Sequence, residues 1–493
     1  MKTMSRSQPR LLAPRQAVLK PDSGTPQFSR TMMLAVAIFW IAFAGDTVRY
    51  TIGWIGYLLV VAVLAVLSAI SLRRRHSPVR LQHLPLPLMA FVTWCLASTA
   101  WSRYPLETLM GWGAQVVTAY FGLTLALSLT RFQFFRALGF TLRLLVAGSL
   151  LFELAIRLWA PWGFIPPAYL YLNELTMLSG AEAPATPQDF PSSLYWSHAN
   201  LFTTEALQGL PGNRNLLAII AIMAIVTTAA QLWDHQLPRL YGAISLMLAS
   251  FTLLHTRSVT AFISLAFVML AVGLVLLGRH LSRYARWAMY LVVGAVLASG
   301  ALFVVLNNNE IFAIFNRSSD MSGRGDIWRA VIALGNESPW VGIGWISYWA
   351  PWLPEFHNLA VIAGTPYHQA HNSFLDVWMQ TGLVGVLLFT MLVVAALIRT
   401  WWIAIDRPDA PIVQYTDHRG FHRHAAGQTA IPFLILVALV VQSMTESRLI
   451  VEGAWLFLCW SASYAKFRMH TPAFLPRHLH PTRTTEIDVV RDV

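Results

Sequence analysis

The chain has 493 residues, of which 56% are hydrophobic and only 12% are charged, and its formal net charge is +12. Soluble proteins carry about 25% charged residues, so this composition indicates an integral membrane protein. It excludes a soluble nucleic-acid-binding protein, whose basic residues would lie on a solvated surface. Residues 1–30 are polar and basic and contain no short apolar segment ending in a cleavage site, so we expect an uncleaved cytoplasmic tail there.

Twelve apolar segments approach the length of a membrane-spanning helix, which needs about 20 mostly apolar residues. In chain order they are 31–45, 51–72, 84–101, 108–129, 138–158, 215–233, 239–256, 258–278, 285–306, 379–399, 429–445 and 448–465. A chain that crosses lipid must satisfy its backbone hydrogen bonds internally, and no segment alternates like a strand. The sequence therefore predicts an all-α, polytopic membrane bundle over 31–465 with about 12 transmembrane helices.

The basic residues predict how these helices are oriented. If the N-terminus is cytoplasmic, the tails and connections on that side hold 26 of the 35 Lys and Arg residues. Because positive charge concentrates on the cytoplasmic side, we expect both termini there, including a tail over 466–493. The net charge then needs no nucleic acid partner to explain it.

Two long connections, 159–214 and 307–378, fall on the outer side and are too long to be plain turns. Long ordered loops in compact proteins usually carry function. The second, between the ninth and tenth helices, is rich in Trp, Gly and Pro, so we expect it to be partly helical and to contact the membrane surface. Its Trp residues either anchor at the headgroups or stack on sugars.

Two segments in or beside the second loop carry distinctive motifs. SGRGDIWRAVIALGNESPWVGIGW starts at Ser322, and YHQAHNSFLDVWMQTGLVG starts at Tyr367. Their order and spacing resemble the O-antigen ligase/polymerase superfamily over residues 320–390. The likeness continues more weakly in WSRYP from Trp101, in GNRN from Gly212 and in TRS from Thr256.

The resemblance implies a metal-independent glycosyltransferase without a cofactor, at the outer face of the bacterial inner membrane. Its donor would be a glycan on undecaprenyl diphosphate, and its acceptor a saccharide hydroxyl in O-antigen or exopolysaccharide synthesis. We favour a polymerase over a ligase acting on a lipid core or a protein. A flippase and a chain-length regulator are the partner proteins that such a role suggests.

Arginine is the residue type that best stabilises a leaving diphosphate, because its guanidinium stays protonated and offers forked donors. Arg is scarce on the outer side, so Arg214, Arg257 and Arg324 are the candidate diphosphate ligands. Alternatively, these residues form ion pairs with Asp320, Asp326 or Glu446, or extend to lipid headgroups. Arg329 and Arg448 fit structural ion pairs better.

His371 is the candidate general base, because an attacking hydroxyl must lose a proton and imidazole titrates near neutral pH. It precedes Asn372 and Ser373, either of which could cap the tenth helix, and a helix N-terminus also favours phosphate oxygens. His371 could therefore be a base or a phosphate ligand, and Asn372 a further ligand. Asp376 either orients the ring or is solvated.

The remaining candidate supporting residues are Asn215, Asp326, Trp328 and Tyr367, which belong to the same motifs.

Two other classes of function are less consistent with the sequence. A metal site could use His357, His368 and His371 with Glu355 or Asp376, but the spacing fixes no third ligand, so we expect no metal. A transporter or flippase of lipid-linked sugars also needs about twelve spans. Transporters place polar sites at the bilayer midplane in repeated halves, whereas here the polar groups collect in outer loops.

Overall fold

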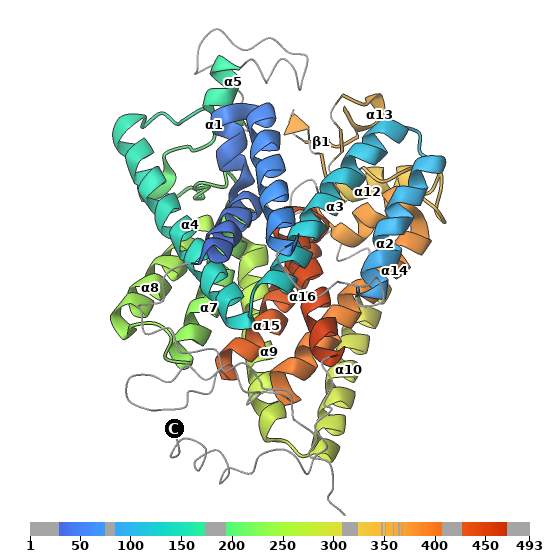
Figure 1. The fold of residues 1–493 in the computed structure, drawn as a ribbon. Helices are drawn as coiled ribbons and strands as arrows, with labels where there is room; N and C mark the ends of the chain where they lie inside the picture. Colours follow the sequence, from blue (N-terminus) through green and yellow to red (C-terminus); the bar gives the residue numbers. More distant parts are fainter. Residues whose placement is uncertain are drawn as a thin grey trace, which may run out of the picture.

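The computed structural model describes residues 29–73, 84–172, 194–307, 324–346, 349–350, 352–357, 359–362, 365–366, 368–406 and 426–470. Over these residues the chain is a helical bundle (Figure 1), with a two-stranded hairpin of β1 (Val361–Ile362) and β2 (Thr365–Pro366). The prediction of an all-α bundle is confirmed.

The first helix, α1 (Arg30–Arg73), consists of two arms. Its backbone leaves helical geometry at Ala44 and Gly53, and a Cβ built on Gly45 would lie 3.2 Å from the Tyr57 ring. Residues twelve apart in a straight helix are separated by about 18 Å, so this contact requires the chain to reverse. Figure 1 shows the two arms side by side, and they correspond to the predicted helices 31–45 and 51–72.

The other predicted segments also fall on helices. These are α2 (Leu86–Ala97, continued by η2, Ser98–Ala100), α3 (Pro105–Ser128), α4 (Arg131–Trp159), α7 (Arg214–Trp233), α8 (Arg239–Thr256), α9 (Val259–His280), α10 (Arg283–Leu306), α14 (Ser373–Asp406), α15 (Ala426–Ser443) and η6 (Ser447–Ile450) with α16 (Glu452–His470). Among the described helices, α1, α3, α4, α7, α9 and α14 are long and apolar enough to cross a membrane. The count of twelve crossings and the orientation stay predictions.

The described parts of the two long connections lie at one end of the bundle, where Figure 1 shows α5, α13 and β1. The first connection contains α5 (Pro167–Tyr171) and η5 (Asn200–Phe202). The second contains α12 (Arg324–Gly335) and α13 (Pro354–His357), as expected for a partly helical loop.

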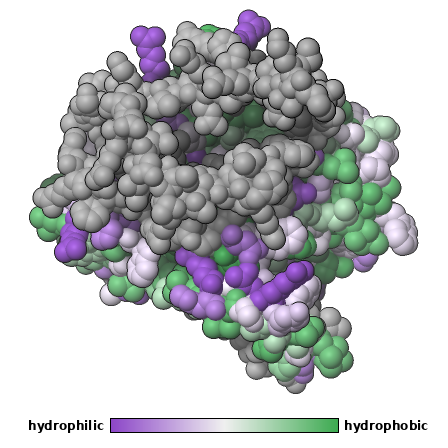
Figure 2. Space-filling view, turned by 60° about the horizontal axis from the view of Figure 1, so that its bottom comes forward, coloured by the Kyte–Doolittle hydropathy of each residue, from purple (hydrophilic) through white to green (hydrophobic). Residues whose placement is uncertain are grey.

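Apolar side chains cover the flank of the bundle. Figure 2 shows hydrophobic residues along its described side, and the exposed residues include Leu58 of α1, Leu270 of α9, Leu291 of α10 and Leu387 of α14. Such extended apolar surface is rare on soluble monomers and suits contact with lipid tails.

A backbone seam joins the outer loop to α14. Gly382 interrupts α14 with a left-handed φ of 66°, and the opened turn receives the segment 339–344. Leu383 N donates to Pro339 O at 2.9 Å, and Gly344 N donates to Gln380 O at 3.0 Å. The glycines of the PWVGIG and TGLVG motifs thus let two backbones touch, and we call residues 339–344 and 379–384 the glycine seam.

Candidate active site

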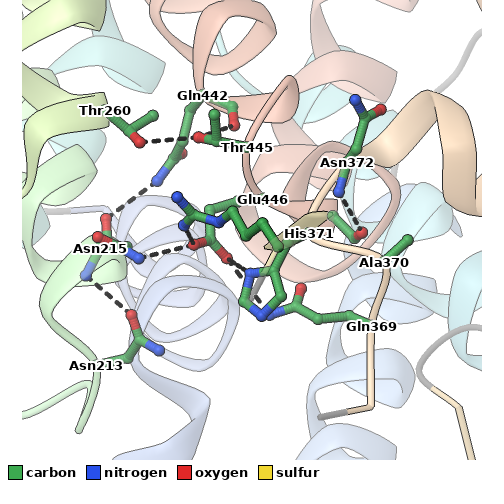
Figure 3. Close-up of polar contacts among 12 residues, drawn as sticks. Asn213, Asn215, Thr260, Gln369, Ala370, His371, Asn372, Gln442, Thr445 and Glu446 are labelled. Carbon is green, nitrogen blue, oxygen red and sulfur yellow. Dashed lines mark hydrogen bonds and ion pairs between the residues drawn. The ribbon is translucent and has the colours of Figure 1, made fainter. Parts of the chain in front are cut away.

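Glu446 lies in the turn between α15 and η6 and is 1% exposed. Its Oε1 accepts hydrogen bonds from Asn215 Nδ2 at 2.7 Å and from Arg324 Nη2 at 3.1 Å. Its Oε2 lies 3.1 Å from His371 Nδ1 and accepts a bond from Gln369 Nε2 at 3.3 Å. We call these five residues the Glu446 cluster; Figure 3 labels Asn215, Gln369, His371 and Glu446. The cluster joins Arg324 and His371, two predicted catalytic residues, to one carboxylate.

The cluster is assembled at the N-terminal ends of helices. Asn213 caps α7, so that Asn215 lies in its first turn, while Arg324 is the first residue of α12. Ser258 caps α9 and donates its hydroxyl to Asn215 Oδ1 at 2.8 Å. Because helix N-termini carry partial positive charge, this position favours an anion.

The charge state of Glu446 follows from its neighbours. Burial alone would raise the pKa of the carboxyl, but His371, Arg324 and Arg448 outweigh burial and lower the pKa from 4.5 to about 2. The carboxylate is therefore ionised throughout the neutral range.

The backbone of His371 is left-handed, with a φ of 51°, which turns its ring toward Glu446. The next residue, Asn372, caps α14, because its Oδ1 accepts from Phe374 N at 3.0 Å and from Leu375 N at 3.1 Å. Its Nδ2 donates to Met444 O at 3.2 Å. These contacts give Asn372 a structural role, and its contact with a diphosphate stays a prediction.

Asp376 neither orients the His371 ring nor is solvated, so both interpretations of it were wrong. It is 2% exposed, and its Oδ1 accepts from Trp349 Nε1 at 2.9 Å and from Gln380 Nε2 at 2.6 Å. Its Oδ2 accepts from Ala370 N at 3.1 Å, so Asp376 supports the backbone before His371. The ring itself contacts Glu446, which comes from another part of the chain.

The other candidate supporting residues differ in their placement. Trp328 of α12 donates its Nε1 to Ala370 O at 3.0 Å and thereby supports the same loop. Asp326 is exposed and pairs with Arg329, so it lies apart from the Glu446 cluster. Tyr367 and Asp320 lie outside the described residues.

Arg257 and Arg214 lie next to the Glu446 cluster, because Arg214 directly precedes Asn215 and Arg257 directly precedes Ser258, which contacts Asn215. Arg257 has a left-handed φ of 50°, ends α8 with an exposed side chain, and directly precedes Ser258. Arg214 is half-buried and directly precedes Asn215. Their diphosphate roles stay predictions, whereas Arg324 forms the ion pair with Glu446 that the alternative interpretation named.

Sequence reasoning missed a second charged cluster beside the first. Arg49, from the turn between the arms of α1, pairs with Asp46 and with Glu452 Oε1 at 2.9 Å. Arg448 Nη1 binds Glu452 Oε2 at 3.0 Å, which fits its predicted structural pairing. Arg49 and Gln369 lie in predicted outer connections, so a search for charges there could have found Arg49, whereas Glu452 and Arg448 fell inside the predicted helix 448–465.

The suggested metal ligands cannot all be placed, because the His357 side chain lies outside the description. Among the side chains that are described, no group of three His, Cys, Asp or Glu residues could hold a metal ion. Metal independence therefore stays an expectation from the resemblance.

Comparison with known proteins agrees with the motifs. Residues 244–390 match the family model described as O-antigen ligase. Over 156 residues the chain is 30% identical to the exopolysaccharide production protein ExoQ of Rhizobium meliloti (strain 1021). This similarity covers 30% of the chain, and the chain spans about a third of that relative's length (36%). The resemblance to the O-antigen ligase/polymerase superfamily is thus confirmed, while Asn215 and Glu446 lie outside the family match.

Proposed function

Because residues 244–390 match the O-antigen ligase family, we propose that the chain is a membrane glycosyltransferase of the O-antigen ligase/polymerase type. It transfers a glycan from undecaprenyl diphosphate to a saccharide hydroxyl at the outer face of the bacterial inner membrane. Both termini are cytoplasmic in this proposal. The six helices suited to crossing a membrane support the placement in a bilayer.

One observation carries the proposal: Arg324 and His371 both contact the Glu446 carboxylate, each at 3.1 Å. A transfer from a diphosphate needs a cation for the leaving group and a base for the attacking hydroxyl. Arginine and histidine are suited to these two tasks. Their proximity supports a single site for both.

The reaction that this site would perform is a single displacement with inversion. His371 removes the proton of the acceptor hydroxyl as its oxygen bonds to the anomeric carbon of the donor. The bond between that carbon and the diphosphate oxygen breaks, and its electron pair leaves with the diphosphate. Arg324, with Arg257 and Arg214 at the border of the site, stabilises the added negative charge.

The acceptor is the next repeat unit in our preferred version, a polysaccharide polymerase in exopolysaccharide or O-antigen synthesis. The printed name of the relative, an exopolysaccharide production protein, supports this choice. A ligase acting on a lipid core or a protein is the alternative. Gel profiles of surface glycan in a deletion strain separate the two: single-repeat products indicate a lost polymerase, and full-length chains retained on the carrier lipid indicate a lost ligase.

The test of the activity uses Arg324→Gln, with Arg329→Gln on the same helix as its matched control. Arg329 is exposed, and its described contacts are local, with Asp326 and with the backbone oxygen of Gly325. We expect Arg324→Gln to lower polymer formation at least about 100-fold, the usual loss when a charge-stabilising group is removed. Arg329→Gln should retain polymer formation.

His371→Ala should also abolish polymer, with His280→Ala, exposed at the end of α9, as its control. Membrane levels of each variant are measured by blotting, and folding by monodispersity in detergent. Normal polymer in both Arg324→Gln and His371→Ala would refute the proposal.

A flippase is distinguished by reconstitution. Purified protein in liposomes should lengthen or ligate a lipid-diphosphate glycan without an ion gradient. Translocation of a lipid-linked probe without any transfer product would favour the flippase.

A further inference from the structure

We propose that Glu446 is the positioning residue of the transfer site, where it orients the His371 ring and holds Arg324 next to it. Glu446 lies outside the region matched to the family and carries no role in the mechanism above. The inference rests on the proposed function and adds a residue to the same site.

The contacts of Glu446 fix the tautomer of His371. Each oxygen of Glu446 faces two donors: Asn215 and Arg324 at Oε1, His371 and Gln369 at Oε2. An ionised carboxylate only accepts hydrogen bonds, so Nδ1 of His371 must carry a hydrogen. The proton of the acceptor hydroxyl is then taken by Nε2.

The pairing of Glu446 with His371 is held rigidly by the backbone around both residues. Ser373 Oγ donates to the backbone oxygen of Glu446 at 3.1 Å, and Asn372 N donates to Ser447 Oγ at 3.2 Å. Asn372 Nδ2 also binds Met444 O at 3.2 Å. Because three bonds join residues 444–447 to the start of α14, the carboxylate and the ring belong to one fixed unit (Figure 3).

The charged groups around Glu446 keep its carboxylate ionised. The groups that face the carboxylate are His371, Arg324 and Arg448, and Arg448 is itself shared with Glu452. Arg49 and Asp46 continue this network behind Glu452. Glu446 stays ionised at neutral pH and therefore stabilises the imidazolium that forms when His371 accepts the proton, while the diphosphate takes the electron pair of the broken bond.

The test uses purified full-length enzyme in detergent with a synthetic lipid-diphosphate glycan, and compares Glu446→Gln with the wild type across pH. Gln keeps the shape but loses the charge. We expect kcat to fall about 100-fold or more, as when the orienting carboxylate of a catalytic histidine is neutralised, while KM for the donor does not rise. The acid limb of the pH–rate profile should move to lower pH, because a protonated ring is no longer paired with an anion.

Two further variants keep the test decisive. Glu446→Asp keeps the charge but withdraws it by one methylene, so it should lower kcat less and move the acid limb less, in the same direction. Glu337→Gln, an exposed carboxylate of the outer loop paired with Arg103, should leave kcat and the pH profile unchanged. If Glu446→Gln does not accumulate in the membrane, the comparison of Glu446→Asp with the wild type still tests the positioning role.

The outcomes separate this inference from the proposed function. An unmoved acid limb in an active Glu446→Gln enzyme would overturn the positioning role and leave the transferase intact. Retained kcat with tighter donor binding would also overturn it, because the carboxylate would then merely occupy the place of a phosphate. A wild-type enzyme without transfer activity would refute the proposed function itself.

Discussion

Gly382 offers the sharpest test of how the outer loop is attached to the bundle. It interrupts α14 with a φ of 66°, and a Cβ built on it would lie 2.1 Å from the backbone carbon of Trp340 and 2.2 Å from its oxygen. Real Cβ atoms essentially never approach other atoms within 3.0 Å, and the obstacle here is backbone rather than a flexible side chain. Gly382→Ala therefore cannot be accommodated without opening the glycine seam.

The expected loss in the free energy of unfolding of Gly382→Ala has three parts. A φ of 66° combined with a ψ of −171° is essentially confined to glycine and costs an alanine about 1–3 kcal/mol. Forcing extra volume into a packed region costs about 1–3 kcal/mol. Separating the backbones weakens the bonds from Leu383 N to Pro339 O and from Val384 N to Trp340 O, each worth about 1 kcal/mol. We expect a loss of about 4–8 kcal/mol, a large share of the roughly 5–15 kcal/mol that stabilises a typical fold.

The assay is thermal unfolding of the purified protein in detergent, followed by tryptophan fluorescence. The matched control is Gly273→Ala, in the regular interior of α9, where a Cβ meets no atom within 4 Å. That change should be neutral or stabilise the helix by up to about 1 kcal/mol. If Gly382→Ala unfolds at the same temperature as Gly273→Ala, the seam does not anchor the loop and the reasoning fails.

Three further predictions use the same unfolding assay. The pKa of Glu446 in the folded protein is lowered to about 2, so its ionised carboxylate contributes about 3 kcal/mol to the free energy of unfolding above pH 4.5, and this contribution is lost as the pH falls toward 2. If the unfolding temperatures of the wild type and of Glu446→Gln fall in parallel as the pH is lowered, this prediction is wrong. Asp376→Ala leaves the buried amide of Ala370 without its acceptor and should cost about 3 kcal/mol, and a variant as stable as wild type would show that Asp376 is dispensable. Arg49→Ala removes one of two cations from half-buried Glu452 and should cost about 2 kcal/mol, which an unchanged midpoint would refute.

The bounds of a helix could be predicted where its apolar segment ends at a proline or a charged residue. The segment 239–256 was predicted with the bounds of α8, because Pro238 precedes it and the charged Arg257 follows it. In contrast, α14 begins at Ser373, six residues before the predicted start. Polar residues such as Asp376 were read as loop, although their hydrogen bonds are satisfied inside the protein.

The site was predictable only in part. Arg324 and His371 stand in a distinctive motif, so the sequence singled them out. Their common partner, Glu446, is 122 and 75 residues away from them in the chain, and it lies in a short polar stretch between two apolar segments, without a motif. No periodicity or spacing reports such a contact, because it depends on how α15 packs against α9 and α14.

The position of Glu446 near the end of the bundle also has a consequence for biosynthesis. A chain is made from its N-terminus, so the segments that carry Arg324 and His371 enter the membrane before residue 446 leaves the ribosome. The carboxylate that joins these groups arrives with α15 and α16, the last described helices of the chain. The proposed transfer site is therefore completed at the end of synthesis, and a nascent chain that already carries the family motif still lacks the carboxylate that contacts Arg324 and His371.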